Sequence, residues 1–176
     1  PPLVTFLDSP MAVRVTEVFK NHEELFDEEM EARVEEGQSP FEFPTLHLVM
    51  ETKQSIAINQ IRGSAIIIAG SGMCTGGRIV SHLAHLLPEP ATNVLFVGYQ
   101  APGTLGRDIV DIANRGELGR ATVRIDGEDI RVRAAVDVLS GLSAHADRNE
   151  LRAWIEAIPN ARSVGLYHGD PDAQQA

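Results

Sequence analysis

The sequence predicts an α/β fold, a three-layer arrangement in which helices cover both faces of a mostly parallel sheet. Strand-sized apolar segments alternate with helical segments along the chain, as in parallel sheets whose strands are joined by helices. The segment SAIIIAG at 64–70 is rich in β-branched residues, which is typical of a strand buried on both faces. We also expect a separate C-terminal piece that holds one helix and one strand.

The first half of the chain is expected to hold two further strands and several helices. LVTFL at 3–7 predicts a buried strand. Ser9-Pro10 predicts the start of a helix, because serine caps helix N-termini and proline suits the first helical position. The remaining expected elements are two helices to about Glu36, a loop at GQSPFEFP, a strand at 46–50 and a short helix through Ser55 and Asn59.

The second half continues the alternation of strands and helices. The expected elements are a helix at RIVSHLAHLL, a strand at 93–98, a helix within GTLGRDIVDIANRG, a helix opened by SGLSAHAD and a strand at 163–167. ATVRIDGEDIRVRAAV predicts a hairpin, because Asp126-Gly127 is a strong turn signal between two apolar segments.

Composition and charge limit the function classes. The 176 residues have one cysteine, which fits a reducing cytoplasm. The net charge is −10, which argues against binding nucleic acid by bulk charge. No apolar run approaches the roughly 20 residues that span a bilayer, so we expect no membrane partner. Eight acidic residues lie within 21–36, where Phe26, Met30 and Val34 predict an amphipathic helix with a solvated acidic face. The rest of the chain is near neutral, so a local phosphate site stays open.

The glycine-rich segment from Gly70 to Arg78, GSGMCTGGR, lies between a predicted strand and a predicted helix. Glycines let a ligand approach the backbone, and free N–H groups at a helix start attract anions. Arg78 in the first turn could add a charge-assisted hydrogen bond. A tight structural turn and a phosphate site are both compatible with this pattern, which is neither a P-loop nor G-x-G-x-x-G.

Histidines supply the other candidates. His145 lies at a loop-to-helix junction, where it either donates a proton near a phosphate or packs while Asp147 caps the helix. His168 follows the last predicted strand and is either a metal ligand or structural. His82 and His85 are spaced to share a metal, but nothing near them in sequence completes such a site, so we expect surface or half-buried residues.

Taken together, five ordered motifs resemble the β-CASP branch of the metallo-β-lactamase-fold nucleases. The resemblance is strongest to ribonucleases akin to the endonuclease subunit of the cleavage and polyadenylation specificity factor. The motifs are LDSPMA (7–12), IIIAGSGMCTGGR (66–78), VLFVGYQAPGTLGR (94–107), GLSAHAD (141–147) and YHGD (167–170).

The resemblance implies a function for the candidate residues. RNA would lie between a β-CASP domain and a metallo-β-lactamase domain, where two zinc ions activate water for attack on a phosphodiester. His145 would be the general acid and His168 a zinc ligand, with the carboxylates of Asp147 and Asp170 beside them. Family members usually have glutamate where this chain has Asp170. The loop with Gly70, Ser71, Gly72 and Arg78 would meet the RNA backbone.

The family's H-x-H-x-D-H signature is absent from these 176 residues. We therefore expect a portion of a longer ribonuclease, with 1–140 as the β-CASP domain and 141–176 as the returning part of the metallo-β-lactamase domain. Such a portion is expected to be inactive and to hold zinc weakly, since zinc sites need three or four ligands. The expected partners are RNA, the metallo-β-lactamase half and, as an open alternative, a second copy. The sequence leaves two other functions open. One is a non-catalytic nucleic-acid-binding or interaction module, and the other is a DNA-processing β-CASP nuclease, although the DNA-processing relatives typically have valine at the position of His168.

Overall fold

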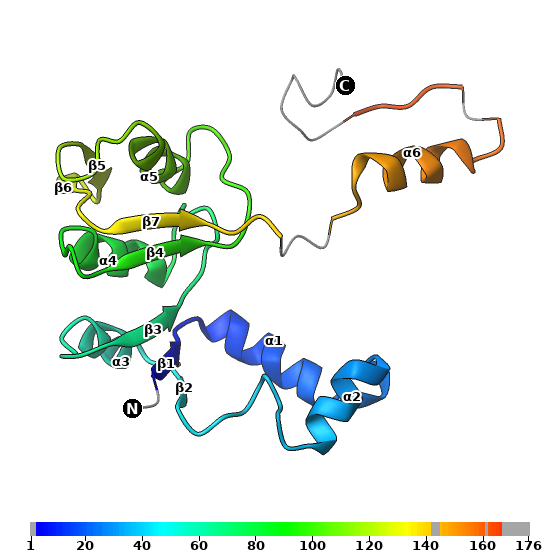
Figure 1. Ribbon diagram of the computed structural model, residues 1–176, viewed down its shortest axis with the longest axis horizontal. Helices are drawn as coiled ribbons and strands as arrows, with labels where there is room; N and C mark the ends of the chain where they lie inside the picture. The colour runs from blue at the N-terminus through cyan, green and yellow to red at the C-terminus, as the bar shows by residue number, and fades with distance from the viewer. Residues whose placement is uncertain (1–2, 142–144, 161, 167–176) are drawn as a thin grey trace. The chain divides into compact units, whose positions relative to one another are not determined.

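The computed structural model describes residues 3–141, 145–160 and 162–166. The chain forms two compact units, residues 1–142 and 143–176, and each is described by itself. Figure 1 shows the strands and most of the helices in the first unit and helix α6 in the second. None of the helices in the described ranges is long and apolar enough to cross a membrane.

A three-stranded parallel sheet opens the first unit. Its strands are β1 (Val4–Leu7), β2 (Leu46–Leu48) and β3 (Ala65–Ile68), in the order β2-β1-β3. In the register of this sheet, Thr5 lies opposite both Leu46 and Ile66. The strands predicted at 3–7, 46–50 and 64–70 are therefore confirmed, and their parallel pairing requires the crossover helices that the sequence predicts.

The remaining strands form two further pairs. Strands β4 (Asn93–Phe96) and β7 (Ala135–Val138) pair in parallel, and β5 (Thr122–Ile125) and β6 (Glu128–Arg131) form an antiparallel hairpin. Asp126 and Gly127 both have positive φ, at 48° and 86°, as a two-residue hairpin turn demands. The predicted hairpin is confirmed at its turn, but its second arm was predicted too long. That arm ends at Arg131, and the residues assigned to its end begin the separate strand β7, which pairs with β4.

The helices begin close to where the sequence places them. They are α1 (Pro10–Lys20), the 3₁₀ turn η1 (Glu23–Leu25), α2 (Glu28–Glu35), α3 (Thr52–Ile58), α4 (Arg78–Leu86), α5 (Leu105–Asn114) and α6 (Arg148–Glu156). The predicted cap of α1 is confirmed, because the Ala12 N–H donates to Ser9 Oγ at 3.3 Å. Phe26 precedes the acidic helix α2 rather than belonging to it, and its ring packs 6.1 Å from that of Phe41.

The main core of the first unit lies on one face of the β4-β7 pair. Helices α4 and α5 contribute Leu83 and Ile109, which pack with Phe96 of β4 and Val123 of β5. Parts of the sheets are open within the described residues, where several apolar side chains on or beside the strands are at least 43% exposed, among them Ile66, Ile68, Leu95, Val97 and Leu139. The α/β class with parallel strands is confirmed, while the covering of both faces is not seen in this part of the chain.

In the second unit, helix α6 begins at Arg148 as a capped helix. The strand predicted at 163–167 is not formed in its described part, because residues 162–166 have no regular secondary structure. A single strand gains backbone hydrogen bonds only from a neighbouring strand, and no described residue pairs with this segment. Tyr167 lies outside the described residues.

Candidate functional site

The glycine-rich loop between β3 and α4 is folded around Ser71. The Ser71 N–H donates to the Gly76 carbonyl at 3.2 Å, and the Cys74 N–H donates to the Ser71 carbonyl at 3.1 Å. The Ser71 hydroxyl oxygen accepts from the Thr75 N–H at 3.0 Å and lies 3.3 Å from the Thr75 hydroxyl. The loop is thus a closed turn with its own hydrogen bonds, and the N–H of Ser71 is already used.

Glycine occupies positions 77 and 72 of this loop for different structural reasons. Gly77 has φ +78°, and a Cβ there would lie 2.5 Å from the carbonyl oxygen of Gly70, so the two ends of the loop cross where only glycine fits. Gly72 has no neighbouring atom within 4 Å of its Cβ position. Within the described residues, the N–H groups of Gly72 and Gly76 donate to no protein acceptor. The loop therefore offers backbone donors before α4, among them the N–H groups of Gly72 and Gly76, and both of these glycines have open space at their Cβ positions.

Gln100, a residue that the sequence analysis missed, holds the loop from the α5 side. Its side chain is buried, and Nε2 donates to the carbonyl oxygens of Gly72 at 2.9 Å and Gly98 at 3.1 Å. The Gly106 N–H donates to the Met73 carbonyl at 3.2 Å. A Cβ on Gly106 would lie 1.8 Å from Gln100 Oε1, so this side of the loop is closely packed. No local sequence rule identifies such a glutamine, because its partners are set by packing.

Arg78, predicted to reach a phosphate, donates hydrogen bonds to protein oxygens in this structure. Its Nη1 donates to Asp8 Oδ1 and, at 3.0 Å, to the Val49 carbonyl, and its Nη2 donates to the Met50 carbonyl at 2.6 Å. The side chain is 17% exposed. Contact of Arg78 with a phosphate stays a prediction, and its guanidinium is engaged within the protein.

Asp8 is the centre of a buried polar network. Its carboxylate is fully buried and accepts hydrogen bonds from Arg78, from Ser55 Oγ at 2.5 Å and from His82 Nε2 at 2.7 Å. Burial alone raises the pKa of Asp8, but hydrogen bonds from Ser55, His82 and Arg78, together with the Arg78 charge, outweigh burial and lower the pKa below its ordinary value. A charged carboxylate is therefore the form that this network holds.

The histidines of α4 differ from each other and from the expectation. His82 is buried, and its Nδ1 lies 2.6 Å from Asn59 Oδ1 while Nε2 contacts Asp8. His85 is exposed and lies 2.9 Å from the Ser81 carbonyl. The expectation of a surface or half-buried position was wrong for His82, because the acid that completes its surroundings is 74 residues away in sequence.

The predicted catalytic residues lie in the second unit. His145 is exposed, two residues before Asp147. Asp147 caps α6, since its Oδ1 accepts from the Asn149 N–H at 2.7 Å and the Glu150 N–H at 2.9 Å, as one of the two alternatives for this motif requires. His168 and Asp170 lie outside the described residues. Within the described ranges, no group of three or more His, Cys, Asp or Glu side chains is arranged to hold a metal ion.

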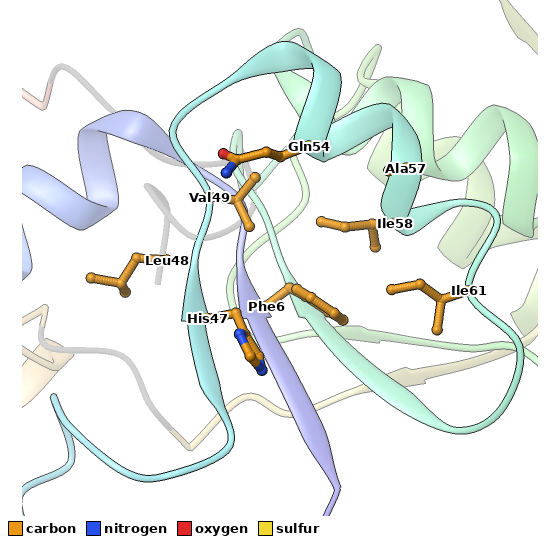
Figure 2. Close-up of a pocket in the computed structure, with 8 residues that line it drawn as sticks. All are labelled: Phe6, His47, Leu48, Val49, Gln54, Ala57, Ile58 and Ile61. Atoms are coloured by element: carbon orange, nitrogen blue, oxygen red, sulfur yellow. The ribbon is translucent and has the colours of Figure 1, made fainter.

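An open groove of about 330 Å³ lies beside the polar network, between β1, β2 and α3. Figure 2 shows the rings of Phe6 and His47 together at its floor, with Ile58 and Ile61 at one side. The two rings stack with centroids 5.5 Å apart. Val49 also lines the groove, while its carbonyl accepts from Arg78. The lining is mostly apolar, so this groove is not a phosphate site.

Comparison with known protein families assigns the fold to a class. Residues 1–109 match the Beta-Casp domain, and residues 129–176 match the Zn-dependent metallo-hydrolase RNA specificity domain. The chain belongs to the Beta-Casp domain family, and the resemblance drawn from its five motifs is confirmed.

The chain is also similar to several curated proteins. It is 40% identical over 167 residues to Ribonuclease TTHA0252 of Thermus thermophilus, covering 95% of this chain and 36% of that protein. It is 38% identical over 141 residues to Transcription termination factor FttA of Pyrococcus abyssi, covering 77% of this chain and 21% of that protein. The Methanocaldococcus jannaschii protein of the same name is 30% identical over 167 residues, covering 94% of this chain and 26% of that protein. The chain thus spans about a third of the ribonuclease and less of the termination factors.

Proposed function

We propose that this chain is the RNA-binding portion of a zinc-dependent ribonuclease that hydrolyses phosphodiester bonds. The observation that carries the proposal is the loop at the start of α4, where the N–H groups of Gly72 and Gly76 have no acceptor within the described residues. Backbone donors at a helix N-terminus favour an anion such as a phosphate. The family matches and the ribonuclease relative support RNA as the source of that phosphate.

Charge favours a few directed contacts over a broad basic surface. The chain has a net charge of −10, which repels RNA at long range. The acids of α2 are exposed, so they add to this repulsion. The loop with Gly70, Ser71 and Gly72 is the contact that we propose for the RNA backbone, with Gln100 fixing its shape.

For catalysis, we propose His145 as the general acid that protonates the leaving oxygen, and His168 as one ligand of a zinc pair. Asp147 and Asp170 are the carboxylates that we propose beside these histidines. Zinc, when bound, supplies Lewis acidity at the phosphate. Since the described residues do not assemble a metal site, no step is assigned to the metal in this chain.

The other parts of the proposal concern organisation and location. We propose residues 1–140 as the β-CASP domain and 141–176 as the returning part of a metallo-β-lactamase domain, with the rest of that domain as the partner that completes the zinc site. A homodimer is a further proposed assembly. The single buried Cys74 supports a reducing, cytoplasmic location.

A direct test compares two glycine substitutions by RNA affinity. Gly72→Ala adds a methyl group beside the free N–H donors, where the structure has open space, so folding is preserved and a phosphate is crowded. We expect weaker binding of a single-stranded oligoribonucleotide, measured by fluorescence anisotropy. Gly165→Ala is the matched control, because Gly165 also has open space and no positive φ. Equal affinities of Gly72→Ala and Gly165→Ala would contradict the proposed phosphate contact.

A second candidate function is transcription termination, which the names of the archaeal relatives suggest. The two candidates differ in the substrate that the full-length protein needs. A ribonuclease cleaves free RNA, whereas a transcription termination factor ends transcription and so releases the transcript. Cleavage of free RNA without transcript release would favour the first candidate, and release would favour the second.

A further inference from the structure

We propose that Asp8 and Arg78 are positioning residues for the loop at 70–77, and that Arg78 acts through Asp8 rather than by contacting phosphate. The inference rests on the proposed function in one respect, namely that this loop binds the RNA backbone. It reassigns the one arginine at the start of α4 from ligand contact to loop support. Three features of the network carry it.

The first feature is the engagement of the guanidinium. Arg78 donates to Asp8 and to the carbonyl oxygens of Val49 and Met50, and its side chain is 17% exposed. A turn of Arg78 toward a phosphate would break these bonds and leave the buried Asp8 carboxylate without its charged partner. Breaking a buried ion pair from one side is strongly unfavourable, so Arg78 stays with Asp8 when an anion arrives.

The second feature is the link from this pair to both ends of the loop. The Asp8 N–H donates to the Ile68 carbonyl at 2.8 Å, at the end of β3 where the chain enters the loop. Arg78 follows Gly77 directly, at the point where the chain leaves the loop. The Ile79 N–H donates to the Gly70 carbonyl at 3.3 Å and closes the loop across its base. The contact of Asp8 with Arg78 therefore fixes the entrance of the loop relative to its exit.

The third feature is the orientation of α4. Arg78 and His82 are four residues apart, so they lie on the same side of the helix. Arg78 contacts Asp8 Oδ1, and His82 Nε2 contacts Asp8 Oδ2 at 2.7 Å. Ser55 of α3 donates to the same Oδ2 at 2.5 Å. Two contacts one turn apart prevent rotation of α4 about its axis, and the rotation of α4 sets the direction of the N–H groups at its start.

Positioning and direct contact predict effects of opposite sign for one substitution. If Arg78 touched phosphate, Asp8→Asn would remove a competing negative charge and strengthen RNA binding. If Arg78 acts through Asp8, the same substitution loosens the loop and weakens binding. Arg78→Lys gives a second distinction, because lysine keeps the charge but cannot reproduce the fork of hydrogen bonds made by arginine.

The experiment has one arm without RNA and one with it, both below the unfolding transition of each variant. In the first arm, amide hydrogen exchange is compared at 70–77 and in α5. We expect Asp8→Asn and Arg78→Lys to speed exchange in the loop by a larger factor than in α5, where exchange follows only the loss of global stability, while Arg124→Lys, which alters an exposed ion pair with Asp129, changes neither. Unchanged loop exchange in both network variants would overturn the positioning role whatever RNA does.

In the second arm, affinity for a single-stranded oligoribonucleotide is measured against salt concentration. We expect both network variants to bind roughly tenfold more weakly, the equivalent of one charge-assisted hydrogen bond. The salt slope should be unchanged, and the double variant should bind no more weakly than either single one. Stronger binding by Asp8→Asn, or a slope reduced by about one in Arg78→Lys, would overturn the inference.

Loss of loop protection with no RNA binding even by the unsubstituted protein would refute the proposed function and leave the positioning role standing. If Asp8→Asn does not fold, Ser55→Ala replaces it in both arms, with the same expected direction.

Discussion

Asp8→Asn should destabilise the first unit by about 3–5 kcal/mol, the usual loss when one partner of a buried ion pair is removed. The carboxylate is fully buried and accepts from three side chains, Ser55, His82 and Arg78. Asparagine has the same shape but presents one oxygen and one NH₂ group, so its NH₂ group would face a side chain that donates to the Asp8 carboxylate in the unsubstituted protein. The guanidinium of Arg78 also loses its counter-charge. Because small domains are stable by only about 5–15 kcal/mol, the variant should be much less stable.

Urea unfolding followed by far-UV circular dichroism measures this effect. Tryptophan fluorescence is unsuitable, because the single tryptophan, Trp154, lies on α6 in the second unit. With an m-value of about 1–3 kcal/mol/M, the midpoint should fall by roughly 2 M. Asp129→Asn is the matched control, since Asp129 pairs with Arg124 on the surface, and exposed pairs contribute about 0–1 kcal/mol. A loss below about 1 kcal/mol for Asp8→Asn would refute the buried-network account.

The pH dependence gives an independent check with a defined sign. The pKa of Asp8 is lowered in the folded protein, so the folded state holds the charged form more strongly than the unfolded chain does. The resulting stability is complete above the ordinary aspartate pKa of about 3.9 and is lost as pH falls through the lowered folded value. The stability difference between the unsubstituted protein and Asp8→Asn should therefore be constant near neutral pH and shrink below about pH 4. A difference that does not change down to the acid transition would contradict this sign.

Three further predictions concern the loop, the cysteine and the histidines. Gly77→Ala should lower stability by about 1–3 kcal/mol, because residue 77 has φ +78° and a Cβ there would lie 2.5 Å from a carbonyl oxygen. Gly98→Ala is the control, since position 98 has open space, and it should leave the thermal midpoint unchanged. Equal midpoints of the two variants would refute the steric explanation of this turn. Burial raises the pKa of Cys74 to about 11 from 9.0, so alkylation at pH 8 should be roughly a hundredfold slower in the folded protein than in denaturant, and equal rates would show that the thiol is accessible. In the full-length enzyme, His145→Ala should cut the rate of RNA cleavage by roughly 10²–10⁴ with little change in RNA affinity, and retained cleavage would refute the role of His145 as general acid. His168→Ala should reduce the amount of bound zinc, and retained zinc would refute its role as a ligand.

Local signals predicted the elements well because they depend on neighbours in sequence. Ser9-Pro10 starts α1 with the expected cap, and Asp126-Gly127 forms the hairpin turn. The extent of the hairpin was not predictable in the same way. The apolar residues after Arg131 suit either a longer hairpin arm or a separate strand. Only the packing of the sheet assigns this segment to β7, which pairs in parallel with β4.

The candidate site was less predictable, because its key contacts join distant parts of the chain. The glycine-rich loop was identified from its composition and its place between a strand and a helix. The surroundings of Arg78 were not, since its partner Asp8 is 70 residues away, and both surface and buried positions satisfy the same local pattern. An aspartate directly after a buried strand, as in LDSP, was the available signal for Asp8. Gln100 gave no such signal, because its role depends on the carbonyl groups that surround it.

The central claim, that the loop at 70–77 binds the RNA backbone, is tested most directly by amide NMR of the protein during titration with a single-stranded oligoribonucleotide. We expect saturable shifts of the Gly72 and Gly76 amide resonances, since these N–H groups have no protein acceptor within the described residues. The amides of Gly116 and Gly119, in the turn after α5, should stay in place. Saturable RNA binding that leaves Gly72 and Gly76 unshifted would contradict the claim.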